Sequence, residues 1–270
     1  METHQNRGRQ IKGLLTVLIV GFAIFLSSDH VAAAQPSTQI VWNTLADGVA
    51  YTWLPYLTPP KNAFLGNLFI ARINPTVALF RVYYQQGKRQ SVHDWAVEYP
   101  GAALIVNASF FDGGYLPEGL VRLGNDILSL PLSRLDSGLF TTSTTVPQVL
   151  PTIDASALEP SSAYRESFES FPVLIKDQHL ATFKDNPSER ARRSVIAQDD
   201  EGNILIIYSS SVELSLTEMA TWIQDSGLSV VTALNLDGGS SAQLHVSGAD
   251  FSALAQGDAQ VPVVLAVYLR

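Results

Sequence analysis

A strand, a capped helix and a second strand follow one another in the last third of the chain, and this order restricts the fold more than any other feature. Ile204 to Tyr208 and Val230 to Leu236 are short apolar runs typical of buried strands. Between them, Ser215 and Glu218 form the capping box of a helix whose apolar residues recur at helical spacing until Gly227 ends it. Because a helix that joins two strands favours a crossover connection, we predict that both strands run parallel in one sheet.

The segment from Val77 to Asn107 repeats this order. Val77 to Tyr84 has a strand pattern, Ser91 opens a short helix that Pro100 ends, and Ala102 to Val106 is a buried-strand pattern. We therefore predict an α/β or α+β fold, in which a single domain contains a mixed β-sheet, crossover helices and long loops.

Two other segments complete the predicted architecture. Arg193 to Gln198 and Ile204 to Tyr208 flank a polar turn and are predicted to form a hairpin. Ser137 to Ser162 is rich in Thr, Ser and Pro, which indicates a long surface excursion from the domain.

The N-terminal segment has the layout of a secretory signal peptide. Residues 1–34 contain a basic start, an apolar stretch from Gly13 to Leu26 and a small-residue end at Ala32 to Ala34. The apolar stretch is shorter than the roughly 20 residues that span a bilayer. We expect cleavage after Ala34, with an uncleaved anchor as the alternative, and one domain over residues 35–270. The protein is thus expected to be secreted, periplasmic or at the cell surface, and to contact a membrane only through this leader if the leader is retained.

The overall charge argues against one class of partner. The formal net charge is −8, and no basic stripe is present that could neutralise a phosphate backbone, so we expect no nucleic acid partner. The chain has no cysteine and therefore neither disulfides nor thiolate metal sites.

Polar groups follow both predicted crossover strands directly. The second strand ends in Asn235-Leu-Asp-Gly-Gly-Ser-Ser241, and the first in Asn107-Ala-Ser-Phe-Phe-Asp-Gly-Gly114. Glycines allow the backbone to approach a ligand closely, but the same residues are common in hairpin turns, so each junction has a structural and a functional interpretation. If both strands lie in one sheet, the two junctions converge at its carboxyl edge, where ligands tend to bind.

Three blocks in order resemble the phosphodiester glycosidase family. They are Asn107-Ala-Ser-Phe-Phe111, Arg193-Ser-Val-Ile-Ala197 and Asn235-Leu-Asp-Gly-Gly-Ser-Ser241, and Ser170-Phe-Pro-Val-Leu174 resembles a fourth segment. This chain departs from the family where it has Ala108-Ser109 for a frequent Gly-Gly and Ala197 for a common glycine. The resemblance covers most of the chain after about residue 40 and implies an exported hydrolase of sugar-1-phosphodiesters. Some bacterial relatives are associated with exopolysaccharide, so cell-surface glycans are an expected source of the carbohydrate or sugar-phosphodiester substrate.

The resemblance also implies roles for individual residues. Asp237 is the leading catalytic carboxylate, as base or nucleophile. Arg193 is expected to bind the phosphate, because its planar guanidinium can hold two phosphate oxygens at once. Glu118 is a candidate second carboxylate. The expected substrate-binding residues are Asn107, Asp112, Asn235, Gly238, Gly239, Ser240 and Ser241.

Metal sites and other chemistries have weaker support. His93, His179 and His245 form no zinc-binding pattern, and no calcium-loop spacing is present, so we predict neither a metal nor another cofactor.

Two alternative functions remain open. One is a noncatalytic polysaccharide-binding or exopolysaccharide assembly factor that uses Trp42, Trp53 and Trp95 as stacking surfaces. The other is a hydrolase of a different linkage, although no Gly-x-Ser-x-Gly elbow is present.

Overall fold

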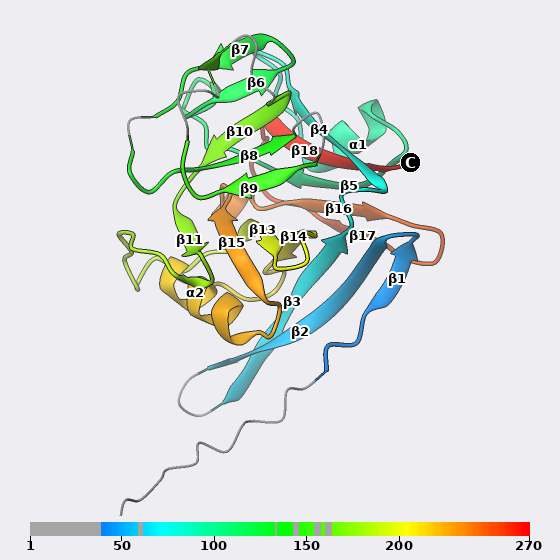
Figure 1. Cartoon of the computed structure of the whole chain (residues 1–270), viewed down its shortest axis with the longest axis vertical. Helices are drawn as coiled ribbons and strands as arrows, with labels where there is room; N and C mark the ends of the chain where they lie inside the picture. Colours follow the sequence, from blue (N-terminus) through cyan, green and yellow to red (C-terminus); the bar gives the residue numbers. More distant parts are fainter. Residues whose placement is uncertain (1–38, 59–61, 133, 143–145, 154–157, 160–163) are drawn as a thin grey trace, which may run out of the picture. The chain divides into compact units, whose positions relative to one another are not determined.

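Three antiparallel β-sheets build the part of the protein that the computed structural model describes (Figure 1). The structure describes residues 39–58, 62–132, 134–142, 146–153, 158–159 and 164–270. The large sheet has the order β1 (Asn43–Ala46), β2 (Val49–Thr58), β3 (Ala63–Ile73), β14 (Ile204–Tyr208), β13 (Ser194–Asp199), β15 (Val230–Asn235), β11 (Val173–Lys176) and β12 (His179–Leu180). The β10 sheet has the order β7 (Asp126–Ser129), β6 (Val121–Leu123), β10 (Glu166–Ser170), β8 (Gly138–Thr142) and β9 (Gln148–Leu150). The β5 sheet has the order β17 (Ser252–Ala255), β16 (Leu244–Ser247), β5 (Ala102–Asn107), β18 (Val263–Leu269) and β4 (Ala78–Tyr84).

Both predicted crossovers are present, each with an antiparallel strand inserted between the strands that it joins. Helix α2 (Leu216–Asp225) leads from β14 to β15, and these two strands run in the same direction on either side of β13. Helix α1 (Val92–Glu98) similarly leads from β4 to β5, which flank β18. The prediction of a mixed sheet was therefore wrong, because every strand pairs with antiparallel neighbours within the described residues.

The helix content is also lower than an α/β architecture implies. The described residues contain two α-helices against three sheets, so the fold is mostly β. Both helices begin as their sequences indicate. The Ser215 side chain accepts a hydrogen bond from the Glu218 backbone N–H while the Glu218 carboxylate accepts from that of Ser215, and Ser91 and Asp94 form the same box in α1.

One apolar core lies between the three sheets, and further buried clusters of described residues pack outside it. Phe69 of the large sheet, Phe168 of the β10 sheet and Leu265 of the β5 sheet are all buried in it. The outer face of the large sheet is covered by α2 through Met219 and Ile223, so its central strands are apolar on both faces. Truncating a buried phenylalanine in such a core costs about 3–5 kcal/mol.

The segment Ser137 to Ser162 is only partly the surface excursion that was predicted. Residues 138–142 form β8, which pairs with the whole of β10, and Leu139, Phe140 and Thr141 are fully buried. Thr141 and Thr142 therefore lie in a β-strand, where β-branched side chains pack well.

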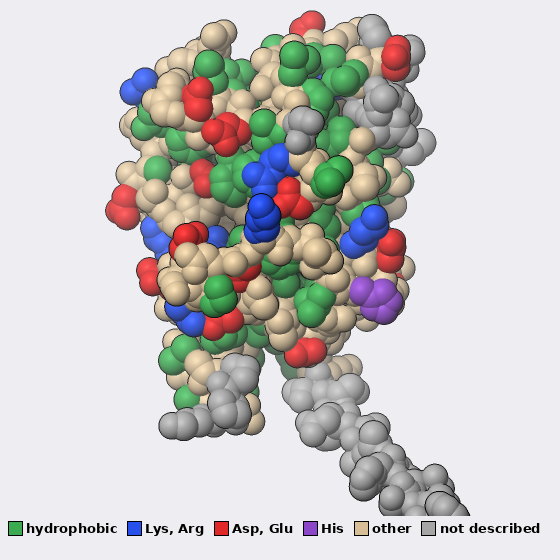
Figure 2. Space-filling view, turned by 90° about the vertical axis from the view of Figure 1, so that its left-hand side faces the viewer, with side chains coloured by type: hydrophobic (Ala, Val, Ile, Leu, Met, Phe, Trp, Pro, Cys, Tyr) green, Lys and Arg blue, Asp and Glu red, His purple; other side chains and the backbone are tan. Residues whose placement is uncertain are grey.

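The proposed leader, residues 1–34, lies outside the described residues. Within the described part of the chain, no helix has the length and apolar character needed to cross a membrane. Figure 2 shows basic and acidic side chains interspersed on one face of the molecule, a distribution that fits the absence of a basic stripe in the sequence.

Candidate active site

The two polar junctions meet although their strands belong to different sheets. Asn107 ends β5, and its side-chain Nδ2 donates a hydrogen bond to the main-chain carbonyl of Asp237 over 2.7 Å. Its Oδ1 accepts from the Ser194 hydroxyl at 2.8 Å and from the backbone N–H of Gln243 at 3.0 Å. Asn107 is fully buried, so its amide is occupied in holding the Asp237 loop in place.

The Asp237 carboxyl is mostly enclosed by the protein. Its Oδ1 accepts from the backbone N–H of Gly238 at 2.9 Å. Burial raises the pKa of Asp237 to about 6, the hydrogen bonds from Ser241 and Gly238 oppose the rise, and the charge of Glu118 adds to it. A carboxyl with this pKa exchanges its proton near neutral pH, as general acid–base chemistry requires.

The glycines after Asp237 form a tight 3-10 turn, η2 (Gly239–Ser241). Gly239 adopts a φ of +61°, and its N–H donates to the carbonyl of Arg192 at 2.8 Å. The N–H of Gly238 is taken by Asp237 itself, as described above. Ser240 is exposed, whereas the side chain of Ser241 is buried and bonded to Asp237. The N–H groups of both glycines are therefore occupied by hydrogen bonds within the protein, and Ser240 faces solvent.

Arg193 lies against this turn. A Cβ atom at Gly238 would stand 3.4 Å from Arg193 Nη1, so the missing side chain gives the guanidinium its space. Arg193 Nε donates to the carbonyl of Leu214 at 2.8 Å and Nη2 to that of Glu189 at 2.9 Å. Burial lowers the pKa of Arg193, and no described carboxylate forms an ion pair with it. Its Nη1 is the guanidinium nitrogen left without a hydrogen bond to the described residues.

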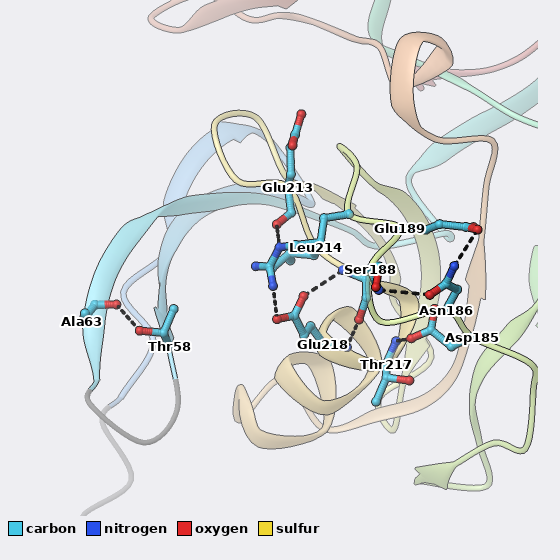
Figure 3. A network of polar contacts seen from close by, with 12 residues as sticks. Thr58, Ala63, Asp185, Asn186, Ser188, Glu189, Glu213, Leu214, Thr217 and Glu218 are labelled. Atoms are coloured by element: carbon cyan, nitrogen blue, oxygen red, sulfur yellow. Dashed lines mark hydrogen bonds and ion pairs between the residues drawn. The ribbon is translucent and has the colours of Figure 1, made fainter.

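The other two arginines of this segment are engaged elsewhere. Arg190 pairs with Glu218 at 2.5 Å and donates to the carbonyl of Glu213 at 3.2 Å. Figure 3 shows Glu213 and Glu218 in this network beside the first turn of α2. Arg192 donates to the carbonyl of Gln256 at 3.0 Å. Arg193 is thus the member of the group that contacts the Gly238 turn with its side chain.

The two acidic residues after Phe111 have different surroundings. Asp112 Oδ1 accepts from the backbone N–H groups of Gly114 at 2.8 Å and Leu116 at 2.9 Å, the pattern of a residue that shapes a turn. Glu118 is exposed, and its charge adds to burial, the largest cause, in raising the pKa of Asp237. The structure thus brings Glu118 toward Asp237, while an oxygen of Asp112 is used within its own loop.

Comparison with known proteins decides the family. The family model described as phosphodiester glycosidase matches residues 100–268, which include all three sequence blocks. The chain belongs to the phosphodiester glycosidase family. No curated protein matches the sequence.

Solved structures share the fold of this phosphodiester glycosidase at low sequence identity. A hypothetical protein from Synechocystis has a TM-score of 0.63 and 18% identity; the match covers 88% of this chain but 65% of that one, so the chain spans less than two thirds of that relative. The zebrafish N-acetylglucosamine-1-phosphodiester alpha-N-acetylglucosaminidase catalytic domain, auto-inhibited by its pro-peptide, has a TM-score of 0.64 and 13% identity over 84% of this chain and 86% of that one. A protein from Burkholderia pseudomallei thought to be exported has a TM-score of 0.56 and 11% identity over 85% of this chain and 96% of that one.

Asn235, two residues before Asp237, ties the Asp237 loop of this phosphodiester glycosidase to a neighbouring segment. It is buried, its Nδ2 donates to the carbonyl of Phe171 at 2.9 Å, and its own carbonyl accepts from the Ser170 hydroxyl at 2.7 Å. Its Oδ1 is buried without a hydrogen bond among the described residues. These contacts tie the end of β15 to the Ser170-Phe-Pro segment, so Asn235 acts on the site through the backbone.

Two residues next to the site, Arg134 and Glu169, were not singled out from the sequence. The rings of Phe110 and Phe171 stack with centroids 4.2 Å apart, and the Arg134 guanidinium lies 4.0 Å over the Phe171 ring. Glu169, in the middle of the β10 sheet, is fully buried. A glutamate in a strand of buried residues was the available signal for Glu169, because a carboxylate is rarely buried without partners.

Among the residues that the structure describes, no three His, Cys, Asp or Glu side chains gather closely enough to hold a metal ion.

Proposed function

We propose that this protein hydrolyses the bond between a sugar C1 and a phosphodiester oxygen. The observation that carries this proposal is the Asp237 carboxyl, whose pKa is raised to about 6 in a loop held by Asn107, with the charge of Glu118 nearby. Membership of the phosphodiester glycosidase family and the fold shared with the zebrafish catalytic domain support the reaction class.

In the proposed reaction the C1–O bond breaks and its electron pair leaves with the phosphate oxygen. Ionised Asp237 either takes a proton from water while the hydroxide adds to C1, or attacks C1 itself and is released by water in a second step. Both routes yield the free sugar and a phosphate monoester. A phosphate leaves as an anion and needs little protonation, so cationic donors can replace much of a general acid's work.

Arg193 is the proposed donor from the Gly238 side of the site. Two of its guanidinium nitrogens are bonded to the carbonyls of Leu214 and Glu189, which fixes its orientation, and Nη1 remains for a substrate oxygen. Glu118 is proposed as the second carboxylate. Asp112, Asn235, Gly238, Gly239, Ser240 and Ser241 are proposed to shape the substrate site, and the exposed Ser240 hydroxyl is best placed for direct contact.

The setting of the reaction is proposed from the sequence. Residues 1–34 would direct export and residues 35–270 would form the catalytic domain. A sugar-phosphodiester on cell-surface or exopolysaccharide glycans is the proposed substrate, and N-acetylglucosamine-1-phosphodiesters are the first compounds to test because the zebrafish relative bears that substrate in its name.

The direct test is product analysis with a panel of sugar-1-phosphodiesters. Wild type should release free sugar, and Asp237→Asn should lose at least about 10³-fold in kcat, in the range seen when a residue central to catalysis is removed. Asp200→Asn is the matched control, because Asp200 is an exposed acid in the turn between β13 and β14. Folded wild type that releases no sugar, or an Asp237→Asn variant as active as the control, would refute the proposal.

The noncatalytic alternative predicts glycan binding without turnover, unaffected by Asp237→Asn. One of its proposed stacking surfaces is not accessible, since Trp95 is fully buried and its Nε1 donates to the carbonyl of Val261 at 3.0 Å. Trp53, 41% exposed, and the half-buried Trp42 remain for that function. The hydrolase is therefore the better supported of the two.

A further inference from the structure

A second arginine, Arg134, lies beside the site although it belongs to none of the three sequence blocks. Its guanidinium stacks on the Phe171 ring, and that ring stacks on Phe110 of the first block. The carbonyl of Phe171 is in turn bound by Asn235 of the third block. The stack therefore links Arg134 to both polar junctions.

Glu169 fixes Arg134 relative to Glu118. One oxygen of its buried carboxylate, Oε2, accepts from the backbone N–H of Leu120, two residues after Glu118, and from that of Leu132, two residues before Arg134, each at 2.9 Å. The single acceptor atom thus joins the chain segments that carry the two charged side chains.

The space around Glu169 is closely fitted to this role. Gly119 has a φ of +105°, and a Cβ atom there would stand 2.8 Å from Glu169 Oε2. A side chain at position 119 would therefore displace the carboxylate that binds both segments. The hydrogen bond with Asp136 is the largest cause that raises the pKa of Arg134, and the charges of Glu169 and Glu118 add to it.

The guanidinium of Arg134 is oriented and also accessible. Nε and Nη2 each donate to a different oxygen of Asp136 at 2.9 Å, which holds the planar fork in one orientation. Within the described part of the chain Nη1 makes no hydrogen bond, and the side chain is 42% exposed. Arg193, in contrast, is largely buried and gives two of its nitrogens to carbonyls.

We propose that Arg134 binds phosphate oxygens of the substrate on the Glu118 side of the site. The inference rests on the proposed function and names a second phosphate-binding residue for it. A phosphodiester that approaches Asp237 and Glu118 brings a negative charge toward two carboxylates in an acidic protein, and a nearby guanidinium offsets that repulsion. The ligand class is a phosphate mono- or diester carried on a sugar.

The test compares Arg134→Gln and Arg134→Lys with Arg165→Gln. Arg165 is an exposed arginine just before β10, and its side chain donates a 3.4 Å hydrogen bond to Asn125, so the control removes the same charge from the same sheet. Two quantities are measured: the affinity for inorganic phosphate by calorimetry, and KM and kcat for a sugar-1-phosphodiester.

Arg134→Gln should weaken phosphate binding and raise KM at least about tenfold, the loss expected for a charge-assisted hydrogen bond. Arg134→Lys should recover part of both, because it restores the charge without the fork. Phosphate affinity equal in Arg134→Gln and Arg165→Gln would overturn the inference. So would a loss of kcat in both Arg134 variants with phosphate affinity retained, because it would indicate a structural role.

The two proposals fail separately. Wild type that binds phosphate through Arg134 but cleaves no sugar phosphodiester would refute the proposed reaction and leave the phosphate site in place. Turnover with phosphate binding that is independent of Arg134 would refute the site alone.

Discussion

The Asn107 side chain donates a 2.7 Å hydrogen bond to the carbonyl of Asp237, a residue 130 positions later in the chain. The bond joins the end of β5 to the loop after β15, and so connects the β5 sheet to the large sheet. Because Asp237 N–H also donates to the carbonyl of Ala108 at 3.1 Å, the backbone of the catalytic candidate is held on both sides by the first junction. The position of Asp237 therefore depends on the packing of two sheets.

Replacing Asn107 with alanine should reduce both stability and activity. The change leaves the Ser194 hydroxyl, the Gln243 N–H and the Asp237 carbonyl without their partner in a buried space, which should cost about 2–5 kcal/mol. Chemical denaturation measures this loss. Asn43→Ala is the control, since Asn43 is exposed and its side chain donates a long, 3.5 Å hydrogen bond to the carbonyl of Tyr51. Equal stability of the two variants would contradict the proposed role of Asn107.

Asp237→Asn should make the folded protein more stable above pH 6. The pKa of Asp237 is about 6 in the folded protein, against about 3.9 in an unfolded chain. Folding therefore takes up protons between these two pKa values, so this group's contribution to stability falls as the pH rises from about 4 to 6 and stays low above that. An asparagine resembles the protonated form and avoids a cost of up to about 3 kcal/mol at pH 7.5.

Denaturant unfolding at several pH values measures this effect. The stability difference between Asp237→Asn and wild type should be largest at pH 7.5 and should shrink toward pH 4, with Asp200→Asn measured as the control. A difference independent of pH would mean that ionised Asp237 is not destabilised by burial.

The sequence predicted the strands and helices of the crossovers because those segments carry local signals. The capping boxes at Ser91 and Ser215 and the fully apolar β5 and β14 are properties of neighbouring residues. Which strands pair is decided at long range. β18 lies between β4 and β5 although it begins at Val263, and no local pattern in 77–107 indicates that insertion.

The candidate site shows the same division. The junction residues Asn107 and Asp237 were found because polar residues after an apolar strand are visible in sequence. Convergence of the two junctions was expected only for strands in one sheet, but they meet across two sheets. Arg134 and Glu169 carry no motif, since their relation to Glu118 exists only once Leu120 and Leu132 meet at one carboxylate oxygen.

Gly238→Ala should impair activity more than stability. The glycine has a φ of −117°, which an alanine adopts without strain, but its Cβ would stand 3.0 Å from the Arg192 carbonyl and 3.4 Å from Arg193 Nη1. Overpacking of this kind costs about 1–3 kcal/mol and should move the guanidinium away from the turn. Steady-state kinetics should show kcat/KM reduced by at least about tenfold, the size of effect expected when a positioned group shifts by about 1 Å.

Gly113→Ala is the matched control, because no atom lies within 4 Å of a Cβ at that position. Activity of Gly238→Ala equal to that of the control would show that Arg193 does not need its place beside the turn.

Glu118→Gln should move the acid limb of the pH–rate profile to lower pH. If Asp237 must be ionised, kcat/KM of wild type should fall as the pH drops below about 6. The charge of Glu118 is one cause of the raised pKa of Asp237, so its removal should lower that pKa, while burial, the largest cause, keeps it above the usual range for Asp.

Profiles of Glu118→Gln and of the exposed Glu213→Gln control, recorded with one sugar-1-phosphodiester, distinguish the possible roles of Glu118. A shifted limb with little change in the plateau would assign Glu118 an electrostatic role, and a shifted limb with a large fall in the plateau would make it the second catalytic carboxylate. A limb that stays at the wild-type pH would show that Glu118 does not act on Asp237 in the free enzyme.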